Sequence, residues 1–157
     1  MQKIAFLTSE EKQLLKQFNS KNNIVSVFYY YWVNTSKPDE NYSFIDVVEF
    51  IFDDNSSLFF KLNEDDSGIS INTDFEFEPY NANLQNEFQQ QIRIQKVEAT
   101  PLKIWNSNLA TSFQEITAIS EKGQLLSSTF WIAFKHQKIE LNFHPLQGLV
   151  VSEYEEV

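Results

Sequence analysis

Apolar and aromatic residues along this chain fall into short runs separated by polar turn residues, a pattern typical of an antiparallel sheet. The clearest example is residues 44–71, where polar connections separate three apolar runs. The first run, 44–52, is apolar except at Asp46 and Glu49, so it fits a strand covered on both faces. Residues 53–57 turn the chain, because Asp, Asn and Ser side chains hydrogen-bond their own backbone in tight connections. We therefore predict a three-stranded meander.

The N-terminal part predicts a helix followed by a strand. Thr8 to Glu11 form a capping-box pattern, and Leu14, Leu15 and Phe18 follow at helical spacing, so we expect a helix over 9–18. Residues 24–33 are β-branched and aromatic and predict a strand. Residues 34–42 contain Lys-Pro-Asp-Glu-Asn and predict an exposed loop.

The middle of the chain is less regular. Residues 74–78 alternate acids with phenylalanines, which predicts a half-exposed strand or an extended edge, ended by Pro79. Residues 80–91 are compatible with one or two helical turns, and residues 91–99 are expected to be extended. Pro101 is suited to open a short helix through Leu109, since its ring fixes φ for a first helical position.

The end of the chain repeats the order of elements found near its start. Residues 113–120 predict a strand, residues 121–124 a turn, and three apolar runs follow at 130–134, 139–143 and 149–151. Aligned with residues 50–71, each of the two connections between these runs is one residue shorter. Two interpretations stay open: a pseudo-repeat of 24–78 and 113–152 bridged by 79–112, or the general similarity of any two meanders.

These elements predict one α+β domain over residues 1–157, dominated by antiparallel sheet, with an N-terminal helix and one or two short middle helices. A chain of this length with 42% hydrophobic residues can bury a sizeable core. The expected core residues are Val47, Val48, Phe50, Phe52, Phe60, Ile69, Trp131, Ile132, Phe134, Leu141 and Phe143.

Composition excludes several classes of function. There is no cysteine, which removes disulfides, cysteine-ligated zinc and thiol nucleophiles, and the three glycines all fall in predicted connections, so no phosphate-binding loop can form. A net charge of −10 disfavours nucleic acids and anionic membranes as partners. The first apolar run is too short for a signal peptide and no run reaches 18 residues, so we expect a cytoplasmic protein without a membrane span.

Candidate catalytic and metal-ligating residues are few. His136 and His144 lie on either side of a predicted strand and are expected in polar turns without a chemical role. Residues 63–74 match a calcium loop only in part, since Asn63 replaces the first Asp and the flanks predict strands. Acids on the open strand face over 74–78 would stay ionised and make a poor catalytic pair. We expect no cofactor, no metal and no enzymatic activity.

Acidic residues concentrate between positions 39 and 78, which hold twelve acids and one lysine. One interpretation is a solvated surface; the other is a docking face for a basic protein, as in inhibitors that block basic toxins. Large rings beside the acids would anchor such a partner. The predicted contact residues are Asp53, Asp54, Glu64, Asp65, Asp66, Asp74, Phe75, Glu76, Phe77, Glu78 and Tyr80. The alternative is that the aromatic surplus lines a pocket for a small apolar or aromatic ligand.

Overall fold

The computed structural model describes residues 5–34, 42–63, 67–109 and 111–154, which contain nine strands and three helices. In chain order these are α1 (Ser9–Asn19), β1 (Ile24–Asn34), β2 (Tyr42–Phe52), β3 (Ser57–Leu62), β4 (Ile69–Asn72), α2 (Phe77–Glu87), β5 (Ile92–Glu98), α3 (Lys103–Leu109), β6 (Phe113–Glu121), β7 (Gln124–Phe134), β8 (Lys138–His144) and β9 (Gly148–Tyr154). All the strand pairs are antiparallel, so the predicted α+β fold dominated by antiparallel sheet is confirmed.

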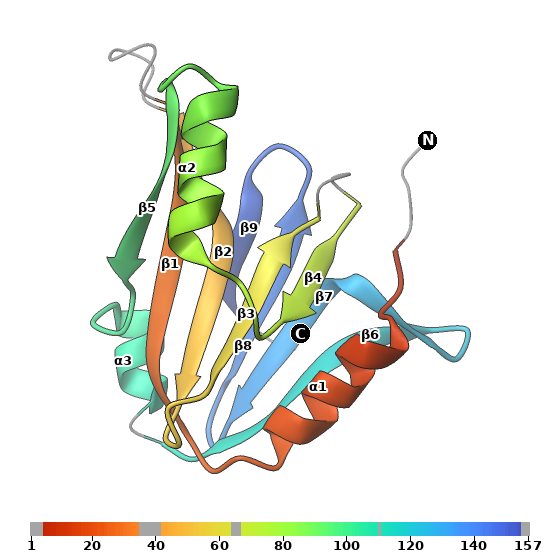
Figure 1. Ribbon diagram of the computed structural model, residues 1–157. Helices are drawn as coiled ribbons and strands as arrows, with labels where there is room; N and C mark the ends of the chain where they lie inside the picture. Colours follow the sequence, from red (N-terminus) through yellow and green to blue (C-terminus); the bar gives the residue numbers. More distant parts are fainter. Residues whose placement is uncertain (1–4, 35–41, 64–66, 110, 155–157) are drawn as a thin grey trace.

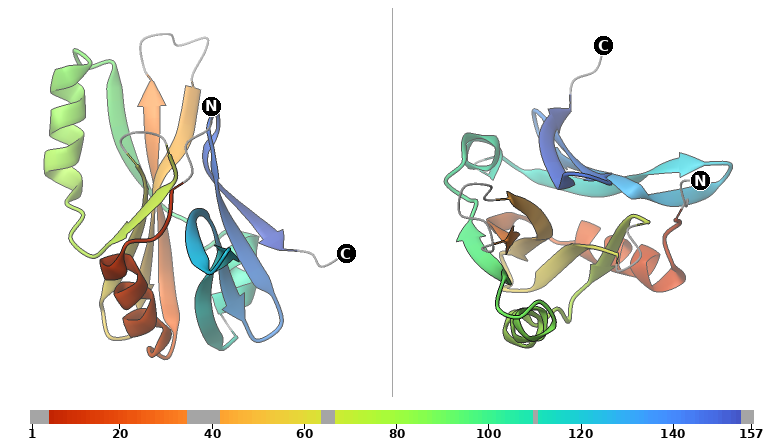
Figure 2. Two further views of the ribbon diagram at one scale, coloured as in Figure 1. Left: turned by 90° about the vertical axis from the view of Figure 1, so that its right-hand side faces the viewer. Right: turned by 90° about the horizontal axis from the view of Figure 1, so that it is seen from above.

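The strands form two layers that face each other (Figures 1 and 2). In the first sheet the order is β5-β1-β2-β3-β4, and in the second it is β9-β8-β7-β6. The layers join where Ile45 of β2 pairs with Leu149 of β9. Helix α2 lies on the outer face of the first sheet, whereas α1 and α3 lie at the two open sides between the layers (Figure 2). The interior between the sheets is therefore closed on two sides by helices.

The main core fills the space between the two sheets. Phe60 lies at its centre, in edge-to-face contact with Phe50 at 5.5 Å and with Phe130 at 5.0 Å between ring centroids. Nine of the eleven predicted core residues are buried; Trp131 and Phe143 are partly exposed instead. Trp131 was misjudged because apolar runs in this chain place large rings on outer sheet faces as well as in the core.

Helix α1 closes the gap between strands β4 and β6. Its predicted capping box is present, with Thr8 and Glu11 each accepting the other's backbone N–H. The second carboxylate oxygen of Glu11 accepts from the Ile71 N–H of β4 at 2.7 Å. At the other end of the helix, the Asn19 amide accepts from the Ile116 N–H of β6 and donates to its carbonyl. Two side chains of one helix thus satisfy backbone groups of two strand edges, in place of a further strand.

Helix α3, on the side opposite α1, is anchored to the core by its own buried tryptophan. Trp105 is fully buried, lies 5.4 Å from the Phe50 ring, and donates its indole N–H to the Tyr29 hydroxyl at 2.6 Å. Burial raises the pKa of Tyr29 to about 12, against an opposing effect of the Trp105 hydrogen bond. The neighbouring Tyr30 also has a raised pKa, because it is buried and donates to the Glu49 carboxylate.

These tyrosines predict a loss of stability in alkali. The pKa of Tyr29 is raised from an ordinary value of 10.0 to about 12 in the fold, so the unfolded chain loses this proton first as pH rises. The stabilisation is complete below about pH 10 and lost progressively toward about pH 12, by about 3 kcal/mol. Urea unfolding across this range should show the fall. The Tyr29→Phe variant should give a flatter pH dependence, and an equal slope in both proteins would contradict the assignment.

The two four-stranded meanders match at several backbone positions. Both have a β-bulge at the start of the first strand, between Ile24 and Ser26 in β1 and between Phe113 and Glu115 in β6. The turn from β2 to β3 is closed by Phe52 N–H to Ser56 C=O, and the turn from β7 to β8 by Phe134 N–H to Gln137 C=O. The packing is reciprocal, since α1 contacts β6 and α3 contacts β1. A common origin of the two units stays a prediction.

The prediction of a strand over 74–78 is wrong. Residues 74–76 are extended without pairing, and α2 begins at Phe77. Pro79 lies at the third helical position, where its missing N–H has no intrahelical partner to lose. The alternation of acids and phenylalanines therefore marked a segment that packs both rings inward before and within the first helical turn.

Candidate ligand-binding cleft

Helix α2 packs on the outer face of the first sheet and forms a second, smaller core with it. The buried members are Tyr30, Val47, Phe59, Leu84 and Ile94. Phe75, Phe77 and Tyr80 pack against them from the α2 side. The Asn81 side chain ties the helix to the sheet by accepting the Ile94 N–H of β5 at 2.8 Å. One face of α2 is therefore fixed against β1, β2 and β5.

A β-bulge places a carboxylate under this helix. Tyr30 of β1 pairs with Val47, whereas the next residue, Tyr31, pairs with Ile45, so Asp46 is an extra residue in β2. The bulge keeps Asp46 on the outer face together with Val47, where it accepts from the Tyr80 hydroxyl of α2 at 2.5 Å. Its residue is only 3% exposed. A regular strand would have turned Asp46 into the main core.

A cleft of about 680 Å³ opens beside this carboxylate, between α2 and strands β1, β2 and β3. Four of its eleven described lining residues are aromatic. Trp32 and Phe44 are stacked, with 5.6 Å between ring centroids and 17° between planes, and Phe88 meets Trp32 edge-on at 5.6 Å. The other lining residues are Asp46, Lys61, Leu62, Asn63, Tyr80, Asn83, Leu84 and Glu87.

Lys61 is the one cation that lines the cleft among the described residues. Its ammonium lies 4.6 Å from the centroid of the Tyr80 ring and donates to the Leu62 carbonyl at 3.2 Å. Glu87 contributes a second acid from the exposed side of α2. The charged groups that line the cleft within the described part of the chain therefore carry a net formal charge of −1.

A second buried carboxylate on this sheet face, Glu49, has a structural role. It accepts from the Tyr30 hydroxyl and from the Ser57 hydroxyl, both at 2.7 Å, and the Lys96 ammonium lies 4.0 Å away. Glu49 does not line the cleft. These partners satisfy the buried charge and join strands β1, β2, β3 and β5.

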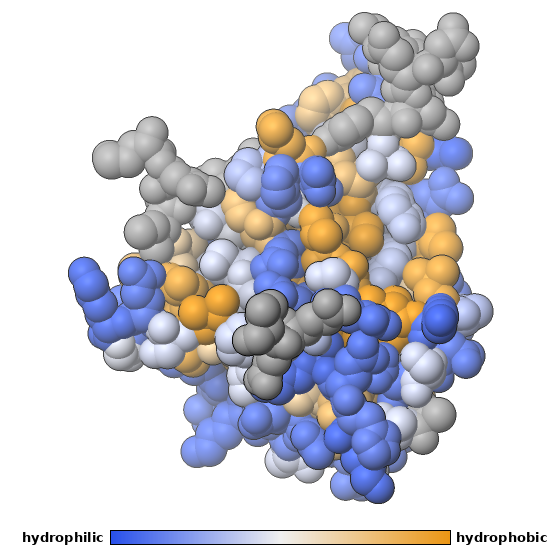
Figure 3. Space-filling model, turned by 180° about the vertical axis from the view of Figure 1, so that it is seen from behind, coloured by the Kyte–Doolittle hydropathy of each residue, from blue (hydrophilic) through white to orange (hydrophobic). Residues whose placement is uncertain are grey.

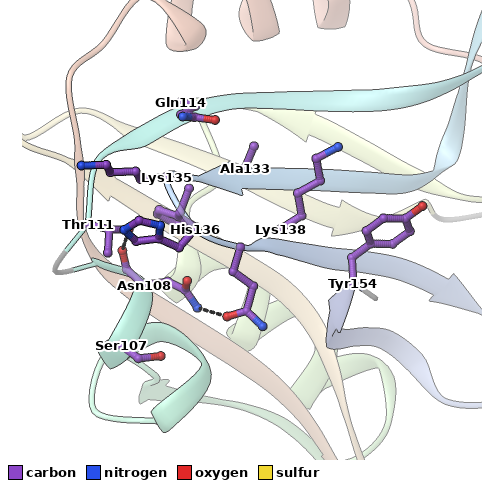
Figure 4. Close-up of a pocket in the computed structure, with 11 residues that line it drawn as sticks. Ser107, Asn108, Thr111, Gln114, Ala133, Lys135, His136, Lys138 and Tyr154 are labelled. Carbon is purple, nitrogen blue, oxygen red and sulfur yellow. Dashed lines mark hydrogen bonds between the residues drawn. The ribbon is translucent and has the colours of Figure 1, made fainter. Parts of the chain in front are cut away.

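Another hollow of about 680 Å³ lies on the far side of the molecule, between α3 and the ends of β7, β8 and β9. Asn108 extends into it from α3, and Lys138 and Tyr154 from the strands (Figure 4). Asn108 donates to the Gln137 side chain at 3.1 Å and to the Ile104 carbonyl of its own helix. This site is wide open and mainly polar, with Lys135 and His136 exposed at its rim, and it contains no buried carboxylate among the lining residues.

The outer face of the second sheet has no helix over it among the described elements (Figure 2). Seen from behind, apolar side chains gather over the middle of the molecule and hydrophilic ones along its lower part (Figure 3). Trp131 lies on this face against Tyr154, with 5.3 Å between ring centroids, and Lys138 lies over both rings. The Trp131 ring is therefore covered by neighbours from β8 and β9 rather than by the main core.

The described acids among the predicted partner-binding residues belong to two segments of the chain. Asp53 and Asp54 lie in the turn before β3, where Lys21 and Ser56 hydrogen-bond to Asp54 and hold its pKa well below its usual range. Glu64, Asp65 and Asp66 fall outside the described residues. Asp74, Glu76 and Glu78 are exposed between β4 and the first turn of α2.

The three aromatic residues predicted as anchors are turned toward the fold. Phe75 contacts Tyr30, Phe59 and Tyr80 at 5.3–5.4 Å between ring centroids. Phe77 lies 5.5 Å from Tyr30. Among the predicted site residues that the structure describes, only Tyr80 lines the cleft.

His144 and Asn63, from the histidines and the calcium-like segment, hydrogen-bond within connections between strands, whereas His136 is exposed. The Nδ1 atom of His144 accepts from the Leu146 and Gln147 N–H groups and so stabilises the β8–β9 turn, a role that the sequence did not predict. Asn63 donates to Ser67 and accepts from Ser70 across the connection between β3 and β4. Within the described ranges, no group of three or more His, Asp or Glu side chains is placed to hold a metal ion.

Sequence reasoning missed most of the cleft. Trp32, Phe44 and Phe88 belong to segments far apart in the chain, and nothing in their local pattern distinguishes them from core aromatics. Asp46 did carry a signal, because it interrupts an otherwise apolar run. A charged residue within a buried strand marks a bulge, a partner or a site.

None of the helices in the described ranges has both the length and the apolar composition needed to cross a membrane. Comparison with protein families gives no match for this chain, and neither curated proteins nor solved structures include one that is similar to it.

Proposed function

We propose that this protein is a non-catalytic binding protein that holds a small apolar or aromatic ligand in the cleft beneath α2. The proposal rests on one observation: four aromatic side chains and one buried carboxylate line a cleft of about 680 Å³. Ligand sites of this size are typically apolar with a few placed polar groups.

The surroundings of the cleft support a preformed site. Tyr80 is tied to Asp46 by a hydrogen bond, and Trp32 is fixed between Phe44 and Phe88. The floor belongs to paired strands, and α2 is anchored to β5 through Asn81. A ligand would therefore meet walls that already have their binding geometry, which lowers the entropic cost of binding.

A basic protein partner stays a prediction. Asp74, Glu76 and Glu78 are exposed around the start of α2 and could attract such a partner, whereas Asp54 is paired with Lys21. Two of the aromatic anchors predicted for such a partner, Phe75 and Phe77, pack into the second core instead, so the cleft is the better supported site.

The proposal predicts that an uncharged apolar dye binds in the cleft. N-phenyl-1-naphthylamine should increase its fluorescence with the wild-type protein, because it leaves water for an apolar site. The Asn83→Trp variant fills the cleft from the exposed face of α2 and should lower dye affinity at least about tenfold.

The matched control is Asn86→Trp, which adds the same ring at an exposed position of α2 that does not line the cleft. Its dye affinity should equal that of the wild type. Absence of a fluorescence increase with the wild type, or equal loss in both variants, would contradict the cleft as the binding site.

A further inference from the structure

We infer that the head group recognised in the cleft is an organic ammonium, so that the ligand is a small amine with an aromatic or aliphatic body. This inference rests on the proposed function, because it assigns a chemical class to the ligand of the same cleft. It is carried by three features: the buried Asp46, the aromatic walls and the position of Lys61.

Asp46 supplies a negative charge where water has little access. The residue is 3% exposed and its carboxylate is positioned by the Tyr80 hydroxyl, which belongs to the cleft wall itself. An ammonium brought to this place gains a stronger electrostatic attraction than it would on an open surface, since the local dielectric constant is lower. A carboxylate ligand would meet repulsion there for the same reason.

The aromatic walls favour a cation as well. The faces of aromatic rings carry negative partial charge, and tryptophan is the strongest cation binder among them. Trp32, Phe44 and Phe88 lie together on one side of the cleft, and Tyr80 lies beside Asp46. The apolar body of an amine could therefore stack on rings while its nitrogen approaches the carboxylate.

Lys61 shows that this environment accepts an ammonium. Its Nζ atom lies 4.6 Å from the Tyr80 ring centroid, within the range of cation–π contacts. The same charge would repel a ligand ammonium, so Lys61 is expected to limit the affinity for amines. With Glu87 at the rim, the described lining groups still carry a net charge of −1, which complements a monocation.

Three compounds with one body and different heads test the inference: 3-phenylpropylamine, 3-phenylpropan-1-ol and 3-phenylpropanoate. Binding is followed by ¹⁵N–¹H shifts of α2 amides and of the Trp32 indole, which the Trp32→Phe variant identifies. The amine should bind at least about tenfold more tightly than the alcohol, and the carboxylate most weakly.

Variants of the charged residues separate electrostatics from shape. Asp46→Asn keeps an acceptor for Tyr80 and should lower the affinity for the amine to about that for the alcohol. Lys61→Met should raise the affinity for the amine and lower that for the carboxylate. Asp53→Asn makes the same change in net charge at an exposed turn outside the cleft and should alter nothing.

Each outcome is decisive, and the wild-type comparison needs no variant to fold. Preference for the amine that Asp46→Asn removes supports the inference. Equal binding of all three compounds, or tightest binding of the carboxylate, overturns it while leaving the cleft as a binding site. If neither the three compounds nor N-phenyl-1-naphthylamine binds, the proposed function fails together with it.

Discussion

Replacing Trp105 with alanine is expected to destabilise the protein by about 3–5 kcal/mol. The side chain is fully buried, contacts Phe50 edge-to-face, and donates to Tyr29. Its loss leaves a cavity under α3 and a buried tyrosine hydroxyl without this donor. Because domains are typically stable by only about 5–15 kcal/mol, urea unfolding of Trp105→Ala should begin at much lower denaturant concentration than in the wild type.

Two further variants test the cause of this loss. Trp131→Ala removes the same side chain from the outer face of the second sheet, where it is partly exposed, and should cost clearly less. Trp105→Phe keeps most of the apolar contact but removes the indole N–H, so it should lie between the two. Equal losses for Trp105→Ala and Trp131→Ala would show that α3 does not depend on its buried ring.

The Gly148→Ala variant is expected to lose about 2–4 kcal/mol in free energy of unfolding. Gly148 has φ of +76°, which an L side chain rarely adopts. A Cβ atom there would lie 2.8 Å from the Ile45 carbonyl and 2.6 Å from the Phe44 ring. The backbone of β2 would have to move at the place where the two sheets join.

Gly123→Ala is the matched control, since Gly123 has φ of +80° but a Cβ atom added there would meet nothing within 4 Å. This variant should lose only about 1 kcal/mol from backbone strain. The difference between the two variants measures the close approach of β9 to β2. Equal losses in chemical denaturation would mean that the sheets separate there without penalty.

The strands and the first helix could be predicted because their signals are local. A capping box marks α1, and β-branched and aromatic runs mark β1, β2, β7 and β8. The connections were equally clear, since each is built from residues that favour turns. These local signals do not tell which face of a strand packs against the core. Trp131 was therefore predicted in the core, whereas it lies partly exposed on an outer sheet face.

The sequence pattern did not predict the start of α2, because the residues there alternate as in a strand. Residues 74–78 alternate with a period of two, yet Phe75 and Phe77 reach the same small core from a bend and a first helical turn. Pro79 reinforced the wrong prediction, because proline ends strands as readily as it enters the first turn of a helix. Tertiary contacts with Tyr30 decided between the two.

The candidate site was even less accessible from the sequence. The predicted anchors Phe75 and Phe77 stand next to acids in the sequence but pack into the second core rather than beside the cleft. Trp32, Phe44 and Phe88 are separated in sequence but adjacent in space. Only Asp46 could have pointed to the cleft, and the bulge that places it there depends on pairing with β1.

The reciprocal packing of the two meanders also governs when the protein can fold. Asn19 at the end of α1 binds Ile116, 97 residues later in the chain, and Leu7 hydrogen-bonds to Leu125. During synthesis, the apolar side of α1, with Leu15 and Phe18, therefore has no complete cover until β6 has left the ribosome. Such long-range closure implies a high contact order and slow folding, which stopped-flow refolding would measure. Helix α1 is synthesised before every strand of the sheet, but it reaches its final packing only after β6 has been synthesised.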